Sequence, residues 1–91
     1  MTERYRVVID RSVQTKDQLF DRITSTAYLG YSSFSGWDAF AEMFRLRLGY
    51  SDIHIDIHNE DLSGLSERDR ATYLELVGDA ASEYPSKLSV S

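Results

Sequence analysis

Residues 52–58 read Asp-Ile-His-Ile-Asp-Ile-His, a strict alternation of polar and apolar side chains. Successive side chains of a β-strand point to opposite faces of a sheet, so this period of two predicts a strand over residues 51–58 with one dry face. The dry face consists of Ile53, Ile55 and Ile57. Because the isoleucines occupy one side only, we expect helices to cover chiefly one face of the sheet.

Two shorter segments near the ends of the chain also have strand character. Residues 5–10 read Tyr-Arg-Val-Val-Ile-Asp and are rich in the β-branched and aromatic residues that pack well on a pleated surface. Residues 87–91 read Lys-Leu-Ser-Val-Ser and alternate in hydrophobicity. Both segments are therefore predicted to be strands.

Helical signals lie between these strands. A first helix is predicted to begin at the capping box formed by Thr15 and Gln18 and to lose regularity near Gly30. A second helix is predicted to begin at a Ser35 cap and to end at Gly49. Its apolar stripe recurs at helical spacing and should face the core. The stripe consists of Trp37, Phe40, Ala41, Phe44 and Leu48.

A third helix is predicted to begin at a Ser66 cap, with acidic residues in its first turn, and to stop before Pro85. Its predicted core stripe is Tyr73, Leu74, Val77, Ala80, Ala81 and Tyr84. The element order is then β-α-α-β-α-β. A helical crossover returns the chain to the same end of a sheet, so this order favours parallel strands. The predicted fold class is α/β, with a small three-stranded, mostly parallel sheet packed with three to four helices.

Size and charge limit the functions open to the chain. Its 91 residues are enough for one domain with a modest core and too few for two, so residues 1–91 are expected to form a single domain. The formal net charge of -5 repels phosphate backbones, which argues against binding of nucleic acid. The absence of cysteine fits a reducing compartment, and the N-terminus lacks the apolar region of a signal peptide. We therefore expect a cytoplasmic protein that does not enter membranes.

Two carboxylates are the best functional lead in the sequence. Asp38 and Glu42 lie four residues apart, which places them on one face of the second predicted helix. Like charges at this spacing cost an isolated helix about 0.2–0.5 kcal/mol, and a cationic partner would remove that cost. The competing interpretation is a solvated helix face on which Asp38 only interacts with the positive end of the helix dipole.

The chain resembles the barstar family, the intracellular inhibitors of a small secreted ribonuclease. The resemblance covers nearly the whole chain and rests on element order, length, acidic balance and the tetrapeptide Trp-Asp-Ala-Phe at residues 37–40, which opens a helix after a tyrosine-containing loop. In that family an acidic helix inserts into the active site of a basic nuclease. Asp38 and Glu42 match its two central acids, and Asp79 matches a peripheral one. Two departures are the Ser-Phe-Ser-Gly approach to the helix at residues 33–36 and the glutamate at the second acidic position.

The resemblance implies a one-to-one complex with a basic ribonuclease or related toxin, and a monomer when free. The loop of residues 28–35 would add aromatic contacts through Tyr31 and Phe34, although packing beneath the loop explains these residues equally well. Trp37 is either an interface anchor or, from its phase with the apolar stripe, a core residue. The alternative function is an immunity or regulatory interaction module directed at a protein that is not a ribonuclease.

Metal, cofactor and catalytic functions have little support. His54, Asp56 and His58 share one strand face, but same-face side chains stand about 7 Å apart, roughly three times a Zn–N bond, so we expect no metal. No cofactor motif is present. A hydrolase built on Asp38 and Glu42 would need a pocket that 91 residues can barely form. We therefore expect a binding protein and not an enzyme.

Overall fold

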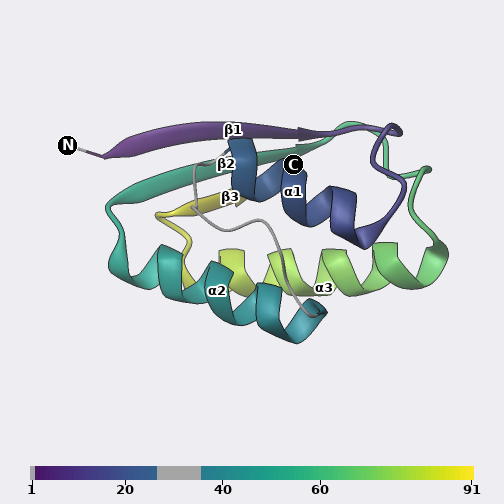
Figure 1. Cartoon of the computed structure of the whole chain (residues 1–91). Helices are drawn as coiled ribbons and strands as arrows, with labels where there is room; N and C mark the ends of the chain where they lie inside the picture. Colours follow the sequence, from purple (N-terminus) through teal and green to yellow (C-terminus); the bar gives the residue numbers. More distant parts are fainter. Residues whose placement is uncertain (1, 27–35) are drawn as a thin grey trace.

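A parallel three-stranded sheet organises the computed structural model, which describes residues 2–26 and 36–91. The strand order is β1 (Glu3–Ile9), β2 (Ile53–Asn59) and β3 (Leu88–Val90), with β2 in the centre. Three helices, α1 (Lys16–Thr26), α2 (Trp37–Tyr50) and α3 (Glu67–Glu83), lie on the same side of the sheet (Figure 1). The predicted order β-α-α-β-α-β and the α/β class are confirmed.

The isoleucine face of β2 forms the centre of the core, as its alternation predicts. Ile53, Ile55 and Ile57 are all buried, and the residues between them are partly or fully exposed. The parallel register places Val7 of β1 opposite Ile57, and Leu88 of β3 opposite Ile55. All three strands therefore present one apolar face to the helices and leave the other face open to solvent.

Stacked aromatic rings join α1 to α2 beneath the sheet. The ring of Phe40 stacks on that of Phe20 with centroids 4.4 Å apart, and Phe44 continues the stack at 5.6 Å. Trp37 meets Phe20 edge to face at 5.0 Å. Offset stacking and edge-to-face contacts are the arrangements that aromatic rings prefer, so this cluster fixes how α2 lies against α1. Of the predicted stripe of α2, Phe40, Phe44 and Leu48 are buried, whereas Trp37 and Ala41 are partly exposed.

The ends of α2 differ from the prediction. The N-cap is Gly36, which has no side chain to cap the helix, and the predicted cap Ser35 lies outside the described residues. At the other end, α2 continues through Gly49 to Tyr50 and is capped by Ser51. A Cβ at Gly49 would lie 3.1 Å from the hydroxyl oxygen of Tyr84. Gly49 therefore serves close packing against the end of α3 and does not terminate the helix.

The third helix follows the prediction at its start and departs from it on one face. The hydroxyl of Ser66 accepts a hydrogen bond from the Asp69 N–H at 3.1 Å, as the predicted cap requires. Tyr73 is buried, and its hydroxyl donates to Asn59 Oδ1 at 2.6 Å. Burial raises the pKa of the Tyr73 hydroxyl, which stays neutral. Leu74, predicted to lie in the core, is 44% exposed because a helix rotates by about 100° from Tyr73 to its neighbour.

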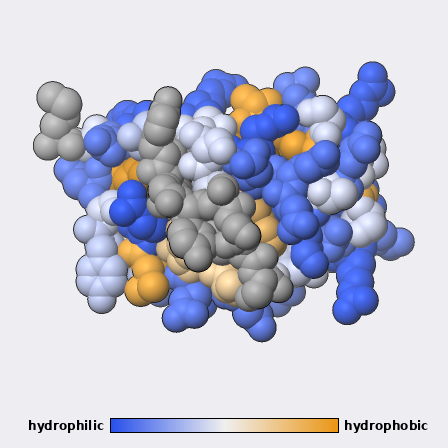
Figure 2. Space-filling view, in the orientation of Figure 1, coloured by the Kyte–Doolittle hydropathy of each residue, from blue (hydrophilic) through white to orange (hydrophobic). Residues whose placement is uncertain are grey.

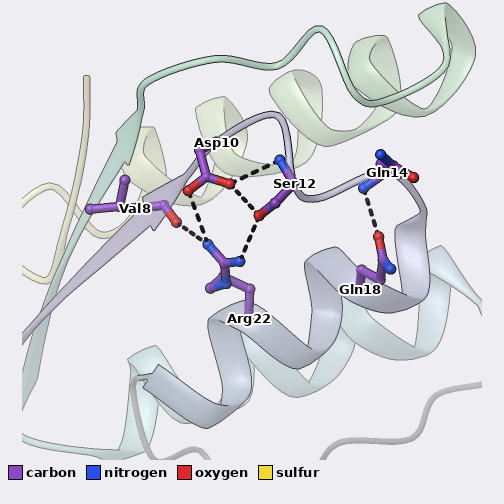
Figure 3. Close-up of polar contacts among 6 residues, drawn as sticks. All are labelled: Val8, Asp10, Ser12, Gln14, Gln18 and Arg22. Atoms are coloured by element: carbon purple, nitrogen blue, oxygen red, sulfur yellow. Dashed lines mark hydrogen bonds and ion pairs between the residues drawn. The ribbon is translucent and has the colours of Figure 1, made fainter.

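Arg22 ties α1 to the carboxyl end of β1 (Figure 3). Its guanidinium donates to the Val8 carbonyl at 2.9 Å and to Ser12 Oγ at 3.1 Å, and it lies 3.8 Å from Asp10 Oδ2. The other carboxylate oxygen of Asp10 accepts bonds from the hydroxyl and, at 3.0 Å, from the N–H of Ser12. These bonds from Ser12, with the Arg22 charge, lower the pKa of Asp10. The network closes the turn between β1 and α1.

The two glycines 64 and 78 provide a matched stability test. A Cβ at Gly64 would lie 2.5 Å and 2.6 Å from the carbonyl oxygens of Arg11 and Val13, whereas a Cβ at Gly78 meets nothing within 4 Å. Gly64→Ala should lower the free energy of unfolding by roughly 1–3 kcal/mol because it forces two loops apart. Gly78→Ala should raise it by about 1 kcal/mol, since alanine favours the helix interior. Urea unfolding of both variants checks this, and equal effects would contradict the loop packing.

The lowered pKa of Asp10 predicts a pH-dependent contribution to stability. Because the folded-state pKa lies below the usual value of 3.8, the contribution is present above that value and is lost as pH falls through the folded pKa. Asp10→Asn should therefore be less stable than the parent chain at about pH 7, and the difference should shrink below about pH 4. Ser12→Ala should show the same convergence in urea unfolding. A difference that stays constant with pH would contradict the network.

Candidate functional site: an acidic groove between two helices

Side chains of α2 and α3 line a groove on the surface of the molecule. Three of its residues are acidic and one is basic, so the groove is negative, and Leu76 and Trp37 add apolar surface to it. The lining residues are Trp37, Asp38, Ala41 and Arg45 from α2 and Thr72, Glu75, Leu76 and Asp79 from α3. The structure thus brings together Asp38 and Asp79, which are 41 positions apart in the sequence.

Helical spacing explains why these residues share the groove. Asp38, Ala41 and Arg45 follow one another at intervals of three and four along α2, and so lie on one side of it. On α3, Glu75 and Asp79 are four residues apart and are both exposed. The walls are held by the core beneath them, because the neighbouring residues Phe40 and Phe44 of α2 are fully buried.

Asp38 also has a local role. It is the second residue of α2, within the first turn, where the unpaired backbone N–H groups and the helix dipole favour a negative charge. The N-cap Gly36 supplies no side chain to these groups. Asp38 is nevertheless exposed and lines the groove. Asp38 can therefore interact with the helix dipole and still present its carboxylate to a partner.

Glu42 lies on the same helix but faces a different hollow. It is exposed, one turn beyond Asp38, and lines a shallow depression with Ala39, Met43, Leu46 and Arg47. This depression lies on the side of α2 that is turned away from α3. A partner that contacts both Asp38 and Glu42 would consequently span the exposed face of α2, and not only the groove.

The basic residue of the groove is weakly held. Arg45 Nε lies 3.7 Å from Glu83 Oε2, and the two side chains are 49% and 50% exposed. Exposed ion pairs of this kind contribute about 0–1 kcal/mol, so this pair does little to fix the position of Arg45. If a cationic ligand displaced Arg45 from the groove, the loss of the pair with Glu83 would therefore cost little.

Trp37 belongs to both the core and the groove. Its ring packs edge to face on Phe20, and the residue is partly buried. It also forms part of the groove wall beside Asp38. Trp37 therefore packs partly against the core as its phase predicts, and its role as an interface anchor stays a prediction. Tyr31 and Phe34, the aromatic contact residues expected in the preceding loop, lie outside the described residues, as do Tyr28 and Ser35.

The open face of the sheet carries the His-Asp-His pattern of β2. His54 Nδ1 donates to the Ser86 carbonyl at 3.0 Å, and Nε2 lies 3.1 Å from both Asp56 Oδ1 and Ser89 Oγ. His58 instead contacts Ser91 Oγ at 3.2 Å. Within residues 2–26 and 36–91, no group of three or more His, Asp or Glu side chains is arranged to hold a metal ion. The described histidines thus link β2 to the segment of β3.

Comparison of the chain with protein-family models, with curated proteins and with solved structures found no match. The resemblance to the barstar family stays a prediction, based on the sequence features given above. None of the described helices is both long enough and apolar enough to cross a membrane.

Glu75 is the acidic residue of the groove that was not among the residues predicted from the sequence, and Arg45, Thr72 and Leu76 were not among them either. The spacing of four residues between Glu75 and Asp79 repeats the spacing of Asp38 and Glu42 one helix earlier, and this repetition was the available signal. The spacing alone does not show that the two acidic faces meet. That meeting depends on how α2 and α3 pack against the sheet, which periodicity within one helix does not specify.

The clustering of carboxylates should cost stability. Replacing Glu75→Gln and Asp79→Asn together removes like charges from the groove and should raise the free energy of unfolding by about 0.5 kcal/mol at low salt. The gain should disappear near 1 M salt, where charges are screened within about 3 Å. The control Glu67→Gln, in the first turn of α3, should instead lower stability because it loses an interaction with the helix dipole. A double variant no more stable than the parent at low salt would show that the acids do not repel.

Proposed function

We propose that this chain is a protein inhibitor, an immunity protein of the barstar type, that binds a basic secreted ribonuclease one to one and blocks its active site. The observation that carries the proposal is the acidic groove, in which two helices present Asp38 and Asp79 together, with Glu42 one turn away. The net charge of -5 supports it, because complementary charge accelerates association with a basic partner. Binding would take place in the cytoplasm of the cell that makes the nuclease.

The mechanism follows from what a ribonuclease site must contain. Such a site binds phosphates with lysine, arginine and protonated histidine side chains. Carboxylates fixed on a helix occupy the place of the substrate phosphates and accept charge-assisted hydrogen bonds from these groups. The inhibitor needs no catalytic group of its own, and its role is to cover the site.

The structure supports distinct roles for the three acids. Asp38, between the groove and the exposed face of α2, would be the central anchor, and Glu42 would extend the contact along that face. Asp79, on α3, would contact the rim of the nuclease site. Trp37 and the loop residues Tyr31 and Phe34 would supply the apolar part of the interface. Glu75 would add negative charge to the groove.

The prediction is a graded loss of inhibition. Asp38→Ala or Glu42→Ala should each cost about 2–5 kcal/mol of binding, roughly 30- to several-thousand-fold, because a partner cation is left desolvated and unpaired. Asp79→Ala should cost less and act mainly on the association rate, with a smaller effect at high salt. The control Glu60→Ala removes the same charge from an exposed residue in the loop after β2. This variant should inhibit the nuclease as tightly as the parent chain.

The test begins with capture. The immobilised chain is exposed to secreted proteins of the producing cell, and the bound fraction is assayed for ribonuclease activity and for its inhibition by added free chain. The variants then titrate the captured nuclease at two ionic strengths. If Asp38→Ala and Glu42→Ala inhibit as tightly as Glu60→Ala, the acidic helix is only a solvated face. Capture of a protein without ribonuclease activity would favour an immunity or regulatory module with another target.

A further inference from the structure

The outer face of α2 carries a second apolar stripe. Ala39, Met43, Leu46 and Tyr50 follow one another at intervals of four, three and four residues. Leu46 is 50% exposed and Tyr50 is 88% exposed. Hydrophobic surface over α2 is visible in Figure 2, next to hydrophilic surface. A helix that only covers a sheet needs one apolar stripe, so a second one on its outer side calls for an explanation.

The stripe lies mostly outside the core. Leu46 and Tyr50 are exposed, whereas Ala39 and Met43 are partly buried, and Met43 also packs against the edge of the core. A helix turns by about 100° per residue, which centres the stripe about a quarter of a turn from the buried Phe40 and more than a third of a turn from the buried Phe44 and Leu48. Intervals of four, three and four are those of the a and d positions of a heptad, the narrow seam along which two helices pack in a coiled coil. The outer stripe of α2 therefore has the pattern of a helix-pairing seam.

Opposite charges border the stripe. Glu42 precedes Met43 on one side, at the g position of one heptad, and Arg47 follows Leu46 on the other, at the e position of the next heptad. No ion pair of either side chain is found within the described part of the chain. Since the two residues lie on opposite sides of the stripe, they do not pair within one helix. Their charges remain available to another helix.

We propose that a second copy of this chain covers the stripe, with the two α2 helices packed in parallel about a two-fold axis. In a parallel pair, a g residue meets the e residue five positions later on the other helix, so Glu42 of each copy would meet Arg47 of the other. Ala39, Met43, Leu46 and Tyr50 would each lie beside their own counterparts. An antiparallel pair would place Glu42 beside Glu42, and like charges oppose that arrangement.

This dimer replaces the expectation of a monomer for the free protein and does not rest on the inhibitor function. The seam is limited to the 14 residues of α2, which bury less surface than the roughly 1,600 Å² of a standard interface, so the dimer should be weak. It covers Glu42. A nuclease that binds Glu42 would therefore dissociate the dimer, and dilution would expose the acidic face.

Sedimentation equilibrium of the full chain over a concentration series tests the dimer. The average mass should rise from 10.4 kDa towards twice that value. Glu42→Arg, which places positive charges on both sides of each contact, should raise the dimer dissociation constant about tenfold. The double exchange Glu42→Arg with Arg47→Glu should return it to within about threefold of the parent value. Leu46→Asp should abolish the dimer. The controls are Glu60→Arg, with the same change of charge elsewhere, and Leu74→Asp, on the exposed face of α3.

Orientation has a separate test, because the chain contains no cysteine. Ala39→Cys places the new thiol beside its counterpart only in the parallel pair, within the roughly 7 Å between Cα atoms that a disulfide allows. Mild oxidation should then link two chains, and Leu46→Asp should prevent the link. Circular dichroism establishes that each variant is folded. A parent chain that stays at 10.4 kDa at every concentration, or a double exchange that fails to restore pairing, would overturn the proposal.

Discussion

The burial of one face of β2 is the constraint on which the rest of the structure depends. Ile53, Ile55 and Ile57 lie in the central strand, so every other apolar element must reach them from the same side. Two helical crossovers then have to lie side by side beneath a narrow sheet, and they turn their outer faces to solvent. The one-sided arrangement leaves α2 and α3 adjacent and half open, which is the condition for a groove between them.

Periodic features of the sequence predict this fold well, because periodicity is local. The alternation in residues 52–58 and the Ser66 cap each involve neighbours in the chain, and the structure has both. Glycine was misleading at Gly49, since its small size serves contact with Tyr84, a residue that no local pattern connects to it. Leu74 was assigned to the core stripe because it is hydrophobic and follows Tyr73. The rotation of the helix from one residue to the next turns its side chain towards solvent instead.

The candidate site was predictable only in part, for the same reason. Asp38 and Glu42 are neighbours on one helix, so their shared exposure follows from spacing. Asp38 lines the groove, whereas Glu42 lines a separate hollow, and Glu75 and Asp79 of α3 join Asp38 in the groove. These placements depend on the packing of α2 against α3. Carboxylates gathered at such a site repel one another and slightly lower the free energy of unfolding, so other contacts must hold the helices in place. The stacked rings of Phe20, Phe40 and Phe44 provide that support directly behind the acidic face.

The bond from Arg22 to the carbonyl of Val8 has a consequence for the outer edge of the sheet. The carbonyl of Ile9 accepts bonds from the segment after β2, so that of Val8, one residue earlier, points the opposite way, to the side where no strand of the described residues neighbours β1. Exposed edges recruit strands from other chains and seed aggregation. Here a guanidinium from the chain's own helix occupies an acceptor that an added strand would need, and Arg4 and Arg6 place exposed charges along the same strand. These side chains oppose the addition of a fourth strand at β1.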